Sequence, residues 1–314
     1  MQIKHGCDNL KNMTETNNTP VKPRQAATVI LVRQKDQELQ IYLLKRSPKS
    51  GFMAGNYVFP GGTVDLEDRD ANFWKSHVDI EPESISSRSG GNLSVEKALY
   101  YGVAAIRETF EEAGVFLAHR KEQAKRDLER LNDMRMTSGL PKGWLRDLVT
   151  DEGWTLQLTG FGRWAHWISP ELMQRRYDTR FFMACMPRDQ ECTPDLIETM
   201  QGIWISPEKG LAGNFKGDIP LSPPTLVTLH ELLKFSSLKA LKNEMKTRTW
   251  GKALLPRLIA SHNGKMIVEQ WDPMFDQDVD INTSGLEKAI LPPGEPFSRI
   301  WFNKGLWQPV GLKQ

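Results

Sequence analysis

Three glutamates in one short segment have the spacing of metal ligands. They lie in the run Arg107-Glu108-Thr109-Phe110-Glu111-Glu112-Ala113-Gly114-Val115. In an α-helix, residues three and four positions apart share a face, so Glu108 would lie beside Glu111 and Glu112. Carboxylates at this spacing repel each other, and hard divalent cations such as Mg²⁺ and Mn²⁺ relieve that repulsion while also binding phosphate oxygens. The spacing favours a metal site for phosphate chemistry. Taken alone, it is more typical of a solvated acidic helix face.

The helix that must position this segment has well-defined ends. Ser94 is a favourable N-cap residue, and Gly114 suits the left-handed position that follows a helix. Between them, apolar residues recur at spacings of three and four, which predicts one buried face. These residues are Leu99, Val103, Ile106 and Phe110. Arg107, within the helix, can neutralise part of the acidic charge or orient one carboxylate through a bidentate contact.

Segments with the character of strands and helices alternate around this helix. Apolar and β-branched runs predict strands at residues 26–32, 39–44, 57–59, 163–168, 180–186, 202–205 and 299–302. Gly61 and Gly62 follow the third of these and predict a tight turn. Further helices are expected at about 117–135, 223–234 and 237–247. The mixed order indicates an α/β or α+β fold rather than an all-helical one.

The acidic segment resembles the second half of the Nudix box, the signature of the Nudix hydrolases. Arg107-Glu108, Glu111-Glu112 and Gly114-Val115 match its pattern, and Pro60-Gly61-Gly62 lies where that family has its strand-to-loop glycines. Five residues separate Gly62 from Asp68, which stands where the family usually has Glu. Between Asp68 and Arg107 lie 38 residues (69–106) where the basic pattern has seven. The chain therefore departs from the family by an insertion inside the box.

Several flanking stretches are similar to the coenzyme A diphosphatase branch of the Nudix hydrolases. The similar stretches are LLKRSPKSGFMAGNYVFPGGTVDLEDRD at 43–70, RWAHWISP at 163–170, RYDTRFF at 176–182, WISP at 204–207 and LSPPT at 221–225. The resemblance covers about residues 25–235. It implies the Nudix fold, a mixed β-sheet sandwiched between helices, here with helical additions.

The same resemblance implies the chemistry of the site. Glu108, Glu111 and Glu112 would bind Mg²⁺ or Mn²⁺, together with the backbone carbonyl of Gly62. One carboxylate would act as general base on the attacking water. Glu108 is the candidate inside the box. Glu198, which precedes a strand, is the candidate outside it, although its position is equally typical of an ordinary surface glutamate.

The implied substrate is coenzyme A or an acyl derivative, cut to 3′,5′-ADP and (acyl-)4′-phosphopantetheine. Lys45, Arg46 and Lys49 precede the glycines and are the candidates for binding its phosphates, with Gly61 and Gly62 also in the substrate site. Surface cations are common, so a solvated loop explains them as well. Two alternatives stand beside this hypothesis. One is a Nudix pyrophosphatase for ADP-ribose, NADH or dinucleoside polyphosphates. The other is a non-catalytic Nudix-like nucleotide-binding module, against which the complete set of acids argues.

The chain divides by composition into three parts. Residues 1–24 are polar and are expected to form a disordered leader. Residues 25–248 are expected to form the Nudix domain, with an insertion at 69–93, which lacks periodicity and predicts a loop or lid, and a helical addition at 117–150. Residues 249–314 are expected to form a C-terminal extension packed on the domain.

The bulk properties narrow the partners and the compartment. The 314 residues are 39% hydrophobic and 25% charged, which permits a sizeable core. A net charge of +2 gives no basis for binding nucleic acid or a membrane. Three cysteines without a metal-binding spacing favour a reducing compartment. No apolar leader or spanning run is present, and the final Leu-Lys-Gln is not an SKL-type peroxisomal signal. A cytoplasmic protein is expected, and a homodimer is left open.

Overall fold

The computed structural model describes residues 20–85, 87–88, 93–121, 125–261, 264–277 and 285–311. Most of the expected leader, residues 1–19, lies outside these ranges. Among the described helices, none combines the length and the apolar character needed to cross a membrane.

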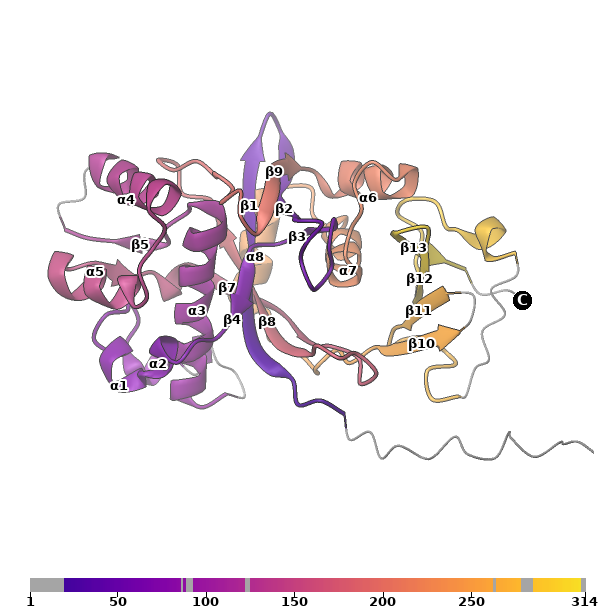
Figure 1. The fold of residues 1–314 in the computed structure, drawn as a ribbon, viewed down its shortest axis with the longest axis horizontal. Coiled ribbons are helices and arrows are strands. Elements are labelled where there is room, and N and C mark those ends of the chain that lie inside the picture. Colours follow the sequence, from indigo (N-terminus) through magenta and orange to yellow (C-terminus); the bar gives the residue numbers. More distant parts are fainter. Residues whose placement is uncertain are drawn as a thin grey trace, which may run out of the picture.

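A mixed sheet forms the centre of the molecule (Figure 1). Its strands within the described residues are β1 (Arg24–Lys35), β2 (Glu38–Arg46), β3 (Tyr57–Val58), β4 (Gly61–Thr63), β7 (Phe161–Ile168), β8 (Tyr177–Cys185) and β9 (Thr199–Ile205). The order is β3-β2-β1-β8-β7, with β4 paired to β1 and β9 to β2. Only the β1–β8 pair of this described sheet is parallel. Successive residues of β1 from Val29 to Val32 are all buried, because both faces of the sheet are covered.

Helices cover the two faces of this sheet. On one face lies α3 (Val95–Ala113), and on the other lie α6 (Pro207–Lys216), α7 (Pro223–Leu232) and α8 (Leu238–Thr247). Val29 and Leu31 of β1 pack toward α3, whereas Ile30 and Val32 pack in the cluster that contains residues of α6, α7 and α8. The alternation of side chains along a strand produces this division. The expected fold, a mixed sheet between helices with helical additions, is confirmed.

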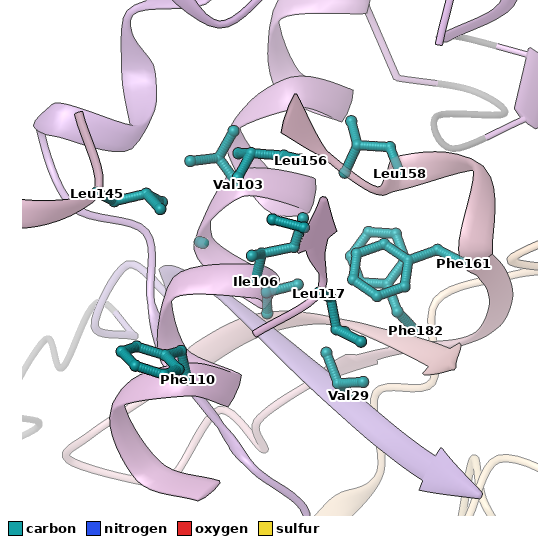
Figure 2. Packing of buried hydrophobic residues seen from close by; sticks show 14 of the residues in the cluster. Val29, Val103, Ile106, Phe110, Leu117, Leu145, Leu156, Leu158, Phe161 and Phe182 are labelled. Atoms are coloured by element: carbon teal, nitrogen blue, oxygen red, sulfur yellow. The ribbon is translucent and has the colours of Figure 1, made fainter. Parts of the chain in front are cut away.

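Helix α3 has the ends and the buried face expected from its sequence. The Ser94 hydroxyl accepts a hydrogen bond from the Lys97 N–H at 3.4 Å, and Gly114 has a φ of 70°. Val103, Ile106 and Phe110 point into the core, where they meet Val29, Leu145, Leu156 and Phe182 from other elements (Figure 2). This packing fixes the rotation of the helix and therefore the direction of its acidic face.

The two glycines before the acidic helix form a strand instead of the expected turn. Gly61–Thr63 is β4, in which Gly61 pairs with Thr28 and Gly62 with Ala27. The φ of Gly61 is 152°, and a Cβ at that position would overlap with the carbonyl oxygen of Ala27. Glycine is required here because β1 approaches too closely for a side chain.

The insertion at 69–93 is folded in its described part, so the expectation of a loop or lid without regular structure is wrong there. It contains the end of η1 (Glu67–Arg69), then α1 (Ala71–Trp74) and α2 (Pro82–Ile85). Trp74, Ile80 and Ile85 are buried in the same core as α3. These apolar residues are too far apart to show a period, yet each occupies the core. Residues 86 and 89–92 lie outside the described ranges.

The helical addition at 117–150 differs from the single helix expected over 117–135. Ala118–His119 is β5, which pairs with β6 (Thr155–Leu156), and α4 begins only at Lys125 and runs to Thr137. Leu128 and Leu131 of α4 are buried, in line with the expected apolar stripe, while Ala124 lies outside the described residues. A further helix, α5 (Trp144–Glu152), was not predicted.

The C-terminal extension forms its own antiparallel sheet, which the sequence patterns predicted only at its third strand. The described strands are β10 (Arg257–Ser261), β11 (Gly264–Val268), β12 (Arg299–Asn303) and β13 (Leu306–Val310), in that order. The short helix η4 (Leu286–Ala289) lies between β11 and β12 in the chain. Ile267, Ile300 and Trp307 join the core cluster of α6 and α7. The Asn214 side chain of α6 donates a hydrogen bond to the Trp307 carbonyl at 3.0 Å.

Candidate active site

The acidic face of α3 lies directly on the glycine strand β4. The Gly61 N–H donates a hydrogen bond to Glu112 Oε2 at 2.9 Å. A Cβ at Gly62 would overlap with the carboxylate of Glu108. Only bare backbone leaves room for both glutamates at this strand. The structure therefore brings Gly61 and Gly62 together with Glu108 and Glu112, as the sequence predicted.

Glu108 and Glu112 are buried carboxylates without enough positive charge around them. Burial raises the pKa of Glu112 to about 8, against the opposing effects of the Gly61 N–H and of Arg46. Burial also raises the pKa of Glu108 well above its usual value; Arg107 opposes this, and Glu112 and Glu111 add to it. Because burial disfavours the charged carboxylates, a cation beside them would stabilise their ionised form.

Arg107 connects the acidic helix to the loop after β4. Its guanidinium holds Asp68 in a bidentate pair, with Nε to Oδ1 at 3.0 Å and Nη2 to Oδ2 at 2.9 Å. Nη1 donates to Glu111 Oε2 at 2.8 Å and to Glu108 Oε1 at 3.1 Å, and Nη2 donates to the Thr63 carbonyl at 2.8 Å. The insertion therefore does not separate Asp68 from Arg107. The expected role of Arg107 as an orienting group agrees with these contacts.

Glu111 shares Arg107 with Glu108 and has one further partner on the helical addition. Its Oε1 accepts a hydrogen bond from Trp144 Nε1 at 2.7 Å, and its Oε2 is bound by Arg107. It faces a small cavity that Lys142 and Arg146 of the helical addition also line. The three glutamates share the helix face that their spacing predicts: Glu108 and Glu111 both bind Arg107, whereas Glu112 binds the Gly61 N–H. Accordingly, no three His, Cys, Asp or Glu side chains of the described residues are gathered closely enough to hold an ion.

The chemistry of Glu108 and Glu112 nevertheless fits a hard divalent cation. Both offer carboxylate oxygens, the ligands that Mg²⁺ and Mn²⁺ prefer. Both are held against backbone, and burial raises the pKa of both. A bound cation would remove the electrostatic penalty that the metal-free arrangement carries.

Of the three cations predicted in the loop before the glycines, Arg46 reaches the carboxylates. Its Nη1 lies 3.8 Å from Glu112 Oε1, and its Nε donates to Ser50 Oγ at 3.1 Å. The Lys45 ammonium lies 5.6 Å from the centre of the Tyr57 ring. Lys49 is exposed. The sequence placed all three on one loop and could not rank them.

Glu198, the second candidate base, lies at the rim of this cluster. Its Oε2 is 3.8 Å from Arg46 Nη2, and its side chain is 65% exposed. Its carbonyl accepts a hydrogen bond from the Ser47 N–H at 2.9 Å, which ties it to the cationic loop. It directly precedes β9, as expected. Arg46 thus stands between the buried Glu112 and the exposed Glu198.

Sequence reasoning missed the residues that support the end of α3. The Thr193 N–H donates to the Ala113 carbonyl at 2.8 Å, and the Asp195 N–H donates to the Glu112 carbonyl at 3.2 Å. Arg135 of α4 donates to the Glu111 carbonyl at 3.0 Å. Trp144 holds Glu111 from α5. All four are distant in sequence from the acidic run and carry no local signal that would connect them with it.

Fold and site together define a Nudix hydrolase: a mixed sheet between helical layers, with the Arg107–Glu112 segment of a buried helix packed on a strand of two glycines. Enzymes of this class require divalent metal ions. The chain belongs to the family described as the NUDT19 Nudix domain, whose model matches residues 23–232.

Similar proteins agree with this assignment. The human acyl-coenzyme A diphosphatase NUDT19 is 25% identical over 305 residues, which cover 83% of this chain and 80% of that protein. The protein of the same name from Gallus gallus is 26% identical and covers 88% of each chain. A crystal structure of a Nudix hydrolase from Alicyclobacillus acidocaldarius superposes with a TM-score of 0.56 at 21% identity, over 74% of this chain and 99% of that one. This last similarity shows the fold.

Replacing Gly62 by alanine tests the contact between β4 and the acidic helix. In Gly62→Ala the new methyl group displaces the Glu108 carboxylate, so we expect the affinity for Mn²⁺ to fall about tenfold or more. Isothermal titration with Mn²⁺ measures it. Gly160→Ala is the matched control, because nothing lies within 4 Å of a Cβ there. Equal affinities of the two variants would contradict the placement of Glu108 at the metal.

Proposed function

We propose that this protein hydrolyses the diphosphate linkage of coenzyme A or acyl-coenzyme A, releasing 3′,5′-ADP and (acyl-)4′-phosphopantetheine. The observation that carries the proposal is the packing of Glu108 and Glu112 on Gly61 and Gly62, with Arg46 beside them. This arrangement suits a diphosphate and a divalent cation. Its assignment to coenzyme A is supported by curated relatives from human, Xenopus laevis and Gallus gallus, all named acyl-coenzyme A diphosphatases.

In this proposal Glu108, Glu111 and Glu112 hold Mg²⁺ or Mn²⁺. When bound, such an ion neutralises charge on the phosphate oxygens and acidifies the attacking water. The Gly61 N–H orients Glu112 through its hydrogen bond, and Arg107 orients Glu108 and Glu111. The charge of Arg46 and Lys45 at the end of β2, with Lys49 in the turn that follows, attracts and aligns the phosphates of the substrate.

The attacking water must lose a proton to a carboxylate. Two carboxylates border the place where the diphosphate would lie, Glu108 and Glu198. We favour Glu198 as the general base, because its carboxylate is 65% exposed and can reach a water molecule. Glu108 is instead packed against Gly62 and bound by Arg107. Glu108 then serves as a ligand, and Glu198 accepts the proton at the open side of the site.

A substrate panel tests the proposal. The purified protein, with Mg²⁺ or Mn²⁺, is given coenzyme A, an acyl-coenzyme A, ADP-ribose, NADH and a diadenosine polyphosphate, and the products are identified by mass spectrometry. We expect the highest kcat/KM for coenzyme A or its acyl derivative, with 3′,5′-ADP as a product. A higher kcat/KM for ADP-ribose or NADH would overturn the proposed substrate. Loss of coenzyme A without 3′,5′-ADP would overturn the proposed bond.

A further inference from the structure

Three exposed apolar side chains gather next to the candidate base. In the 193–200 segment, Leu196 is 64% exposed, Ile197 80% and Met200 56%. These are three of the nine large apolar residues that are exposed in the described part of the chain. A cluster of this kind within five residues is unusual for a solvated surface, where single apolar residues are scattered.

Hydrogen bonds hold the 193–200 segment in place. The Asp195 carboxylate accepts from the backbone N–H groups of Ile197 at 3.2 Å, Glu198 at 3.1 Å and Thr199 at 2.9 Å. The backbone of Thr193 and Asp195 is bonded to the end of α3, and Arg135 Nη2 donates to the Thr193 carbonyl at 2.8 Å. The apolar side chains are therefore presented outward by a framework that is bonded to the acidic helix itself.

The backbone of Leu196 is strained, and its side chain is exposed. Its φ is 59°, in the left-handed region, which costs a non-glycine residue about 1 kcal/mol or more. The surrounding hydrogen bonds impose this conformation on a leucine. Backbone strain and exposed apolar side chains occur together in this segment. A role in binding is the simplest physical explanation for this combination.

The three apolar residues flank Glu198, which lies at the rim of the site described above. Glu198 lies between Ile197 and Met200 in sequence, and its carboxylate is 3.8 Å from Arg46, which in turn is 3.8 Å from Glu112. A substrate whose diphosphate lies at Glu112 and Arg46 must extend one of its two arms past this rim. The arm that passes Leu196 and Ile197 meets apolar surface.

We propose that Leu196, Ile197 and Met200 form a binding surface for the pantetheine arm of the substrate and for the acyl chain attached to it. This inference rests on the proposed function. The chemistry matches, because the pantoyl group next to the diphosphate carries two methyl groups and the acyl chain is a hydrocarbon. The corresponding part of ADP-ribose is a sugar, which gains little from apolar contact. The 193–200 segment is thus a specificity-determining part of the site.

The test is the double variant Leu196→Asn/Ile197→Gln. Asparagine tolerates the left-handed backbone of position 196, so the apolar side chains are removed while the segment keeps its conformation. We expect the KM for octanoyl-coenzyme A to rise about tenfold, the KM for coenzyme A to rise less, and kcat to change little. Val21→Gln is the matched control, an apolar-to-amide exchange at a residue that is 52% exposed and precedes β1.

Each outcome of this experiment separates the inference from the proposed function. If the unaltered protein hydrolyses neither substrate, the proposed function fails, and this inference with it. If the unaltered protein hydrolyses both substrates and the double variant keeps both KM values, the proposed function stands and the proposed binding surface is refuted. A fall in kcat at unchanged KM also refutes it, because the segment would then act by positioning Glu198. The single variant Ile197→Gln repeats the test if the double variant proves unstable.

Discussion

Replacing Glu112 by glutamine is expected to reduce the kcat for coenzyme A by about a thousandfold while the protein stays folded. The amide keeps the shape of the side chain and still offers an oxygen to the Gly61 N–H. What it loses is the negative charge that a divalent cation requires. Because burial raises the pKa of Glu112 to about 8, folding near neutral pH requires this carboxylate to take up a proton or to lose its hydration, and glutamine requires neither. Steady-state kinetics and a thermal melt without metal measure the two effects.

Glu111→Gln is the matched comparison for this experiment. It makes the same chemical change one residue earlier, in a side chain bonded to Trp144 and Arg107 instead of to the glycine strand. We expect a smaller loss of kcat than in Glu112→Gln. If Glu112→Gln retained native turnover, the metal-binding role of Glu112 would be wrong. A large drop in melting temperature would instead mean that the carboxylate supports the fold.

Replacing Arg107 by methionine is expected to destabilise the protein by about 3–5 kcal/mol. Asp68 is only 1% exposed and depends on both contacts with the guanidinium. If Arg107 is removed, three carboxylates lose the positive partner that they share inside the protein: Asp68, Glu108 and Glu111. Urea unfolding followed by circular dichroism gives the free energy of unfolding, and the midpoint should fall at an unchanged m-value.

The double variant Arg107→Met/Asp68→Asn isolates the ion pair in this effect. Removing the carboxylate as well as the guanidinium eliminates the unpaired buried charge, so part of the lost free energy of unfolding should return. If the two single changes simply added, Arg107 and Asp68 would not be coupled. If Arg107→Met had the same urea midpoint of unfolding as the unaltered protein, the ion pair would contribute nothing to the stability of the fold.

The parts of the site that local sequence predicts are those encoded by periodicity. The spacing of Glu108, Glu111 and Glu112 and the apolar stripe from Leu99 to Phe110 both follow from the helical repeat. The ends of α3 follow from Ser94 and Gly114. The place of Gly61 and Gly62 came from the resemblance to the Nudix box, and the structure then supplied its physical reason, the close approach of β1.

What local sequence does not encode is which partner each side chain meets. Trp144 takes one oxygen of Glu111 from a helix that no pattern predicted, and so the three glutamates do not converge as their spacing suggested. Arg46 differs from Lys45 and Lys49 only through the strand pairing that turns it toward Glu112. The strands β10, β11 and β13 were missed because their short apolar runs become strands only when they pair with each other.

The contact between Asp68 and Arg107 has a consequence for the length of the chain between them. It fastens both ends of the inserted segment, and α3 begins and ends independently of what lies in between. For a tethered segment, each doubling of length costs only about 0.6 kcal/mol in closure entropy. The acidic helix therefore keeps the spacing of its glutamates when exposed parts of the insertion lengthen or shorten, whereas α1 and α2 are constrained because Trp74 and Ile85 are buried in the core of α3.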